Sequence, residues 1–167
     1  GTLDACWTYA TWNNHFMYPV PADNSWSKAP LKQPSADFPE GGCEFNAMTA
    51  IGGGPVLINE GQFTDSYVQE LFDGTSGIGP DSNQPRTAVG VTADGRMIFF
   101  VCEGREMTSG VYGLTTADVA DVLLDLGCVE AINLDGGGSS CMLVNGNETI
   151  KVSDGSQRAV ASLLMFK

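Results

Sequence analysis

The sequence TTADVADVLLDLGCVEAINLDGGGSS, residues 115–140, contains a helix signal, a strand signal and a glycine-rich loop in that order. Thr115 and Asp118 have the spacing of a capping box, and the apolar residues that follow recur at i, i+3, i+4 and i+7. Gly127 is typical of a helix end. The mostly apolar run from Val129 to Leu134 then predicts a buried strand that leads into the loop.

A β-hairpin is the strongest signal before this helix. Thr87 to Thr92 and Arg96 to Cys102 are separated by Ala93-Asp94-Gly95, and an Asp-Gly step supplies the positive φ angles of a tight turn. If the strands on either side of the helix are parallel, their carboxyl ends share one edge of the sheet, where ligands bind in such units. We therefore expect Glu103 and Asp135 to face one crevice, one or two strand spacings of ~4.8 Å apart.

Short elements are also predicted outside this central region. A helix is expected from Thr64 to Phe72. Apolar runs bounded by turn residues predict further strands at Pro55 to Ile58, Cys141 to Val144, Thr149 to Val152 and Ala159 to Phe166. The predicted class is α+β, with a mixed β-sheet, a strand–helix–strand crossover, a C-terminal antiparallel meander and few helices.

The chain changes character near residue 47. All three tryptophans and five of the eight prolines lie before this point. We therefore expect residues 1–47 to be an extended, aromatic and Pro-rich segment that packs on the body, with residues 48–167 as the domain itself. A chain of 167 residues has the length of one domain with a sizeable core.

The charge of the chain limits its partners. The formal net charge is -12 and the pI is about 4.1, which argues against nucleic acid and anionic membranes, because both are bound by clustered Lys and Arg. No apolar run approaches the roughly 18 residues of a membrane span. A carbohydrate or other small molecule is the favoured partner, and the sequence does not predict an oligomeric state.

Cysteine and histidine usage gives no sign of a zinc site. The five cysteines show no Cys-x-x-Cys spacing, and His15 is the single histidine. We expect mostly buried thiols and a packed or solvated His15, because nothing marks that histidine as the base of a nucleophilic pair.

The glycine-rich loop has two interpretations. Three consecutive glycines let a ligand approach backbone N–H groups, and two serines add hydroxyl donors, which suits an anionic or hydroxylated ligand. The alternative is a hairpin turn, but such a turn needs one or two glycines rather than three. The candidate binding residues of the loop are Gly136, Gly137, Gly138, Ser139 and Ser140. By contrast, Gly52-Gly53-Gly54-Pro55 lacks an acid and is interpreted as a structural turn.

Arginine usage also favours an anion. Arg86, Arg105 and Arg158 each stand between a loop and an apolar run, and a guanidinium group can hold phosphate through two hydrogen bonds. Each arginine taken singly could equally pair with one of the twenty acidic residues. Three of them beside glycine-rich loops favour a shared site.

These residues resemble the phosphodiester glycosidase family, whose members include enzymes that remove N-acetylglucosamine from phosphodiesters. The resemblance covers roughly residues 48–167 and rests on the order and spacing of several short segments. They are Ile51-Gly52-Gly53-Gly54-Pro55-Val56-Leu57, Arg86-Thr87-Ala88-Val89-Gly90, Glu103-Gly104-Arg105, Gly113-Leu114-Thr115, Leu126-Gly127-Cys128, Asn133-Leu134-Asp135-Gly136-Gly137-Gly138-Ser139-Ser140 and Arg158-Ala159-Val160. The family has Asp-Gly-Arg where this chain has Glu103-Gly104-Arg105.

The resemblance implies hydrolysis of a sugar-1-phosphodiester, with cleavage of the anomeric C–O bond and release of free sugar and a phosphomonoester. Asp135 is then the expected catalytic carboxylate and Glu103 its acid/base partner, and the two roles could be reversed. Substrate-binding residues would be the three arginines, which hold phosphate, and Asn133, Ser139 and Ser140, which position oxygen atoms. No cofactor is expected.

The resemblance also suggests that the chain is the C-terminal portion of a longer bacterial protein in the periplasm, cell envelope or medium. Two other functions stay open. One is a non-catalytic carbohydrate-binding module of an envelope protein. The other is a metal-assisted phosphodiesterase, in which Asp135 and Glu103 hold a divalent cation.

Overall fold

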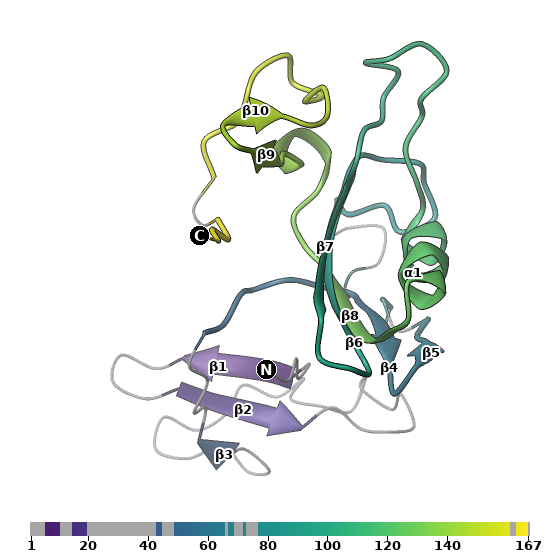
Figure 1. The fold of residues 1–167 in the computed structure, drawn as a ribbon. Helices are drawn as coiled ribbons and strands as arrows, with labels where there is room; N and C mark the ends of the chain where they lie inside the picture. Colours follow the sequence, from purple (N-terminus) through teal and green to yellow (C-terminus); the bar gives the residue numbers. More distant parts are fainter. Residues whose placement is uncertain are drawn as a thin grey trace.

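A computed structural model gives the fold of the chain (Figure 1). It describes residues 6–10, 15–19, 43–44, 49–65, 67–68, 72, 77–160 and 163–166. Near the N-terminus, three antiparallel strands are described by their backbone: β1 (Cys6–Ala10), β2 (His15–Pro19) and β3 (Cys43–Glu44). The other residues of 1–47 lie outside the described part, so the packing of this segment on the body stays a prediction.

The domain is built on a five-stranded sheet with the order β5-β4-β8-β6-β7. Its strands are β4 (Val56–Asn59), β5 (Gln62–Phe63), β6 (Arg86–Thr92), β7 (Met97–Cys102) and β8 (Cys128–Asn133). Every hydrogen-bonded pair in it is antiparallel. The α+β class is therefore confirmed, whereas the expectation of a mixed sheet was wrong for this sheet.

The predicted parallel relation between the two crossover strands holds across an intervening strand. β7 and β8 both run antiparallel to β6, which lies between them, so they run parallel to each other. Their carboxyl ends therefore lie at one edge of the sheet, together with the start of β6. Two strand spacings of ~4.8 Å separate the two ends at this edge.

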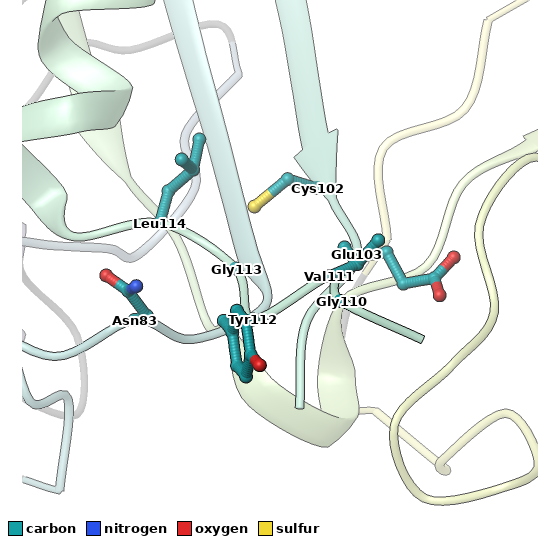
Figure 2. Close-up of a pocket in the computed structure, with 8 residues that line it drawn as sticks. All are labelled: Asn83, Cys102, Glu103, Gly110, Val111, Tyr112, Gly113 and Leu114. Atoms are coloured by element: carbon teal, nitrogen blue, oxygen red, sulfur yellow. The ribbon is translucent and has the colours of Figure 1, made fainter. Parts of the chain in front are cut away.

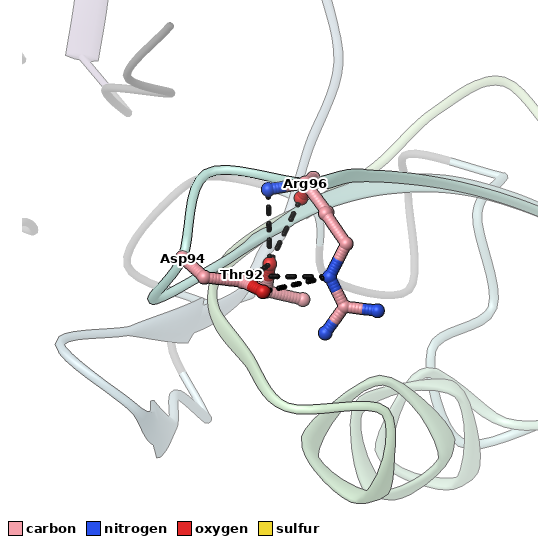
Figure 3. Close-up of polar contacts among 3 residues, drawn as sticks. All are labelled: Thr92, Asp94 and Arg96. Atoms are coloured by element: carbon pink, nitrogen blue, oxygen red, sulfur yellow. Dashed lines mark hydrogen bonds and ion pairs between the residues drawn. The ribbon is translucent and has the colours of Figure 1, made fainter.

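The hairpin that joins β6 and β7 forms as predicted. Gly95 has a φ of 84°, a conformation that side chains rarely adopt. At the turn, the Thr92 hydroxyl donates to the Asp94 carboxylate and accepts from the Arg96 N–H at 3.0 Å (Figure 3). The Arg96 Nε atom lies 2.9 Å from the same carboxylate, in an exposed ion pair.

The helix α1 (Thr116–Asp125) covers one face of the sheet (Figure 1). Both hydrogen bonds of the predicted capping box are present: Thr115 accepts from the Asp118 N–H, and Asp118 accepts from the Thr115 N–H. Core residues shared by the helix and the sheet are Leu57, Ile58, Ala88, Val119, Ala120, Leu123, Cys128 and Ala131. Among the described residues, no helix is both long and apolar enough to cross a bilayer.

The expected C-terminal meander was wrong beyond its first hairpin. Only the two-residue strands β9 (Leu143–Val144) and β10 (Asn147–Glu148) form it. Residues 149–152 and the described part of 159–166 are not strands. Their apolar side chains include exposed ones, such as Leu163 at 71% and Met165 at 76%, so they do not build the buried ladder that the apolar pattern predicted. The helix expected from Thr64 to Phe72 lies partly outside the described residues.

Arg86 begins β6 at the sheet edge and is 2% exposed. Its guanidinium group donates to four main-chain carbonyl oxygens. They are those of Leu114 at 2.9 Å, Ile78 at 3.0 Å, Gly79 at 2.7 Å and Ser82 at 2.7 Å. Arg86 thus fastens the 78–82 loop to the sheet, where it forms part of the cavity described below.

Replacing Arg86 with Met should destabilise the protein by about 3 kcal/mol or more, because four buried carbonyl groups lose a charged donor. Urea unfolding measures this change. Arg96→Met is the matched control, since the Arg96 side chain is 68% exposed and its ion pair should contribute less than about 1 kcal/mol. Equal unfolding free energies for the two variants would contradict the structural role of Arg86.

Candidate functional site

A cavity of about 500 Å³ lies at the sheet edge where β7 and β8 end and β6 begins. Its lining includes one predicted catalytic carboxylate and most of the predicted binding residues. The lining residues are Gly52, Gly53, Gly54, Phe72, Gly77, Ile78, Gln84, Arg86, Arg105, Asn133, Leu134, Asp135, Gly136, Gly137, Gly138 and Arg158. Seven of the nine predicted substrate-binding residues therefore lie in one cavity, together with residues that the sequence did not predict.

Each of the three glycines after Asp135 is in close contact with a different group. A Cβ atom on Gly136 would lie 2.9 Å from the Pro85 carbonyl oxygen, and one on Gly137 would lie 2.9 Å from Nη2 of Arg105. A Cβ atom on Gly138 would collide with the Asp154 carboxylate and the Arg158 guanidinium. The glycines thus allow two arginine side chains to rest directly on the backbone of the loop.

The loop does not present its N–H groups to a ligand in the way the sequence suggested. Residues Gly137–Ser139 form a 3-10 turn. Gly137 donates to the Pro85 carbonyl at 2.9 Å, and Ser139 and Ser140 donate to carbonyls within the loop at 3.0 and 3.2 Å. Because these three N–H groups are bonded inside the protein, the positive charge of the site comes mainly from guanidinium groups.

Arg105 is held from two sides. Its Nε donates to Oε1 of Gln84 at 2.9 Å, and its Nη1 lies 3.5 Å from the Ser153 hydroxyl. The backbone at Arg105 and at Glu106 has φ values of 56° and 55°, a conformation that costs side-chain-bearing residues about 1–3 kcal/mol each. Gln84 and this turn together direct the Nη2 edge toward Gly137.

Arg158 forms an ion pair with Asp154 beside the same loop. Its Nε and Nη2 both donate to Oδ2 of Asp154, at 3.0 and 2.5 Å, and its Nη1 lies 3.4 Å from the Ser139 hydroxyl. The Arg158 side chain is 48% exposed and can therefore also reach an anion in the cavity.

Arg86 also lines the cavity, but its contacts do not fit the expected phosphate-binding role. Four of its five N–H donors are bonded to main-chain carbonyl oxygens. The position of Arg86 explains these contacts. Arg86 is the first residue of a buried strand, so its side chain enters the core beside the 78–82 loop. Arg105 and Arg158 thus supply the two guanidinium groups that contact the glycine-rich loop.

Glu103 is not brought into the cavity of Asp135. It lines a separate hollow of about 420 Å³, and Figure 2 shows its carboxylate turned away from Asn83 and Tyr112. The carboxylate accepts from the Lys151 N–H at 3.1 Å. The Thr108 hydroxyl, with the Lys151 N–H, lowers the pKa of Glu103, so the group is ionised at neutral pH. An ionised carboxylate is a poor general acid.

The separation of Glu103 from Arg105 has a steric cause. A Cβ atom on the intervening Gly104 would lie 2.7 Å from the Pro85 nitrogen and 2.8 Å from the Tyr112 carbonyl oxygen. The chain at Gly104 therefore passes between these groups. The residues on either side of Gly104 diverge: Arg105 turns to the glycine-rich loop and Glu103 turns to Lys151. The sequence placed both carboxylates at the correct edge but could not specify this divergence.

Asp135 is exposed in its cavity, and no hydrogen bond or ion pair joins its side chain to another described residue. Asn133 is buried and donates to the carbonyls of Gly54 and Leu134 at 2.9 Å. Ser140 is fully buried and accepts from the Thr87 hydroxyl at 3.0 Å. Asn133 and Ser140 thus shape the site, whereas Ser139 lies beside Arg158.

The site also contains residues that the sequence did not predict: Gln84, Asp154, Phe72, Gly77, Ile78, Leu134 and the Gly52–Gly54 segment. The Gly52–Gly54 segment, whose pattern predicts a structural turn and which is part of the family resemblance, also lines the cavity. A Cβ atom on Gly53 would lie 2.6 Å from the Asn133 carbonyl, and one on Gly54 would enter the Phe72 ring. Its likeness to the glycine run after Asp135 was the available signal. No sequence signal marks Gln84 or Asp154, because single polar residues in loops are common.

The three cysteines whose side chains the structure describes do not offer a nucleophile. Cys128 is buried, Cys102 and Cys141 are half-buried, and burial raises the pKa of all three thiols. The expectation of mostly buried thiols therefore holds fully only for Cys128 among these. In the described part of the chain, no three His, Cys, Asp or Glu side chains gather at a potential metal site.

Known proteins share both the sequence and the fold. Residues 22–167 match the model of the phosphodiester glycosidase family. An uncharacterized SPbeta prophage-derived protein of Bacillus subtilis, YomE, is 40% identical over 48% of this chain and 12% of its own length. The human N-acetylglucosamine-1-phosphodiester alpha-N-acetylglucosaminidase is 33% identical over 64% of this chain and 20% of its own length.

The solved structure of a hypothetical protein from Synechocystis superposes with a TM-score of 0.54 and 27% identity, over 71% of this chain and 19% of that one. The chain spans a fifth or less of the length of the two curated relatives named above. The family match covers most of this chain and includes every residue of the cavity. The chain therefore belongs to the phosphodiester glycosidase family.

Proposed function

We propose that this chain supplies the phosphate-binding and catalytic part of an enzyme that hydrolyses a sugar-1-phosphodiester. The reaction would cleave the anomeric C–O bond and release free sugar and a phosphomonoester. One observation carries the proposal: a chain with a net charge of -12 directs two guanidinium groups onto a glycine-rich loop beside an exposed carboxylate. Such a concentration of positive charge suits an anionic substrate.

The two arginines would hold the phosphodiester. Nη2 of Arg105 is directed at Gly137, and Nη1 of Arg158 lies beside Ser139, so an anion over the loop can accept from both. Guanidinium groups neutralise charge on the phosphate oxygens, and this charge grows as the anomeric C–O bond breaks. Arg105 and Arg158 together, here called the phosphate clamp, would therefore activate phosphate as a leaving group. They would also fix the orientation of the sugar.

Asp135 would act on the sugar. Cleavage at the anomeric carbon passes through an oxocarbenium-like state, which a nearby carboxylate stabilises or traps. Asp135 follows the strand that leads into the phosphate-binding loop, and its side chain is not engaged with any described residue. Because phosphate leaves as a stable anion, the step needs little assistance from a general acid.

An apolar wall of the cavity is suited to the sugar. Phe72, Ile78 and Leu134 are among its lining residues. Aromatic and aliphatic side chains contact the apolar face of a sugar ring or an acyl substituent. Because the human relative is named for N-acetylglucosamine phosphodiesters, we propose this sugar as the first substrate to test. A periplasmic or secreted location is part of the same proposal and follows from the family resemblance.

Product analysis tests the reaction with a synthetic N-acetylglucosamine-1-phosphodiester. We expect free sugar and phosphomonoester, and we expect Asp135→Asn to lower kcat by about 10²- to 10⁴-fold. Asp121→Asn, on the exposed face of α1, is the matched control and should leave kcat unchanged.

Other products would identify the other functions. Sugar phosphate plus alcohol, with a rate that chelator abolishes and added metal restores, would indicate a metal-assisted phosphodiesterase. Binding without turnover of any phosphodiester would indicate a carbohydrate-binding module. Either outcome would contradict the proposed glycosidase.

Glu103→Gln separates an anchoring role from an acid/base role. Glutamine keeps an acceptor for the Lys151 N–H, so we expect kcat within about threefold of the unmodified enzyme and an unchanged pH profile. If Glu103 transfers protons in the reaction, Glu103→Gln will instead lower kcat as severely as Asp135→Asn and remove one limb of the pH profile.

A further inference from the structure

The ion pair between Asp154 and Arg158 places a negative charge directly beside the proposed phosphate clamp. Oδ2 of Asp154 accepts from two nitrogen atoms of Arg158, and the pair packs so closely on Gly138 that no side chain fits there. The Asp154 carboxylate is 37% exposed, so water only partly screens it. An anion held over the loop would therefore interact with Asp154 as well as with the arginines.

The net charge at the clamp matches a phosphodiester better than a phosphomonoester. The two guanidinium groups and the Asp154 carboxylate leave a single net positive charge. Arg86 and Asp135, which also line the cavity, add one charge of each sign and do not change this sum. A phosphodiester carries one negative charge, whereas a phosphomonoester carries about 1.5–2 near neutral pH. Without Asp154 the clamp would carry two positive charges and would favour the monoester, which is the product.

We propose that Asp154 is a specificity-determining residue that tunes the clamp to the monoanionic phosphodiester and weakens its hold on the dianionic phosphomonoester. This inference rests on the proposed function for the identity of the anion. The residue acts through Arg158 and through its own charge, and it takes no part in bond breaking. Its consequence is that the product leaves more readily than it would from a clamp of two unopposed arginines.

The effect on the two anions follows from Coulomb's law. A dianion is repelled by Asp154 about twice as strongly as a monoanion in the same position, so its affinity changes by about the square of the monoanion's change. For a partly exposed carboxylate we expect a gain of about two- to threefold for a monoanion when the charge is removed, and of about four- to tenfold for a dianion.

Asp154→Asn tests this inference, because asparagine keeps an acceptor for Arg158 and removes the charge. The probes are dimethyl phosphate and methyl phosphate, a diester and a monoester without sugar. Binding is measured by NMR titration at low salt and pH 8, where methyl phosphate is a dianion. Circular dichroism checks that the variant is folded, and Asp154→Ser serves as a second variant if it is not.

Asp94→Asn is the matched control. It removes the same charge from another exposed aspartate–arginine pair, at the β6–β7 turn (Figure 3). Asp154→Asn should bind methyl phosphate about four- to tenfold more tightly, should bind dimethyl phosphate only about two- to threefold more tightly, and should show stronger product inhibition. Asp94→Asn should leave the affinities for methyl phosphate and dimethyl phosphate unchanged.

Three results would overturn the inference: equal changes for the two probes, weaker binding of both, or no binding of either probe by the unmodified protein. Failure of the proposed function is separate, because the titration does not need turnover. If both probes bind with the expected ratio but no phosphodiester is hydrolysed, the charge-tuning role of Asp154 stands and the glycosidase proposal fails.

Discussion

The close contact of two arginine side chains with consecutive glycines determines the rest of this site. Arg105 rests on Gly137, and the Asp154–Arg158 pair rests on Gly138, so the loop after β8 cannot carry side chains there. The loop is fixed in turn by the hydrogen bond from Gly137 to the Pro85 carbonyl, next to the buried Arg86. These contacts bring the sheet edge, the loop and the arginine side chains together at one place.

The sheet topology explains how residues far apart in sequence meet there. β6 starts between the ends of β7 and β8, so segments near residues 85, 105 and 135 converge without a long connection. The helix α1 makes this possible, because it carries the chain from β7 over one face of the sheet to β8. The residues that match the family include all of those that line this cavity.

Local signals in the sequence predicted the hairpin, the capped helix and β8, because turn chemistry, capping and hydrophobic periodicity act over a few residues. The predicted C-terminal strands did not form, because an apolar run becomes a strand only when a neighbouring strand pairs with it. In the site, residue types were predictable but side-chain directions were not. The packing of Gly104 against Pro85 and Tyr112 parts Glu103 from Arg105, and no local pattern indicates such a contact.

We propose that the glycines after β8 admit the arginine side chains that hold phosphate. The most direct test is the affinity of Gly137→Ala for inorganic phosphate, because a methyl group there displaces the Arg105 tip. Gly146→Ala is the matched control. Gly146 also has a positive φ, 78° compared with 57° for Gly137, but a Cβ atom there would meet open space. Gly137→Ala should bind phosphate about tenfold more weakly than Gly146→Ala, the loss of one charge-assisted hydrogen bond. Equal phosphate affinity in the two variants would show that the contact between Gly137 and Arg105 does not support phosphate binding.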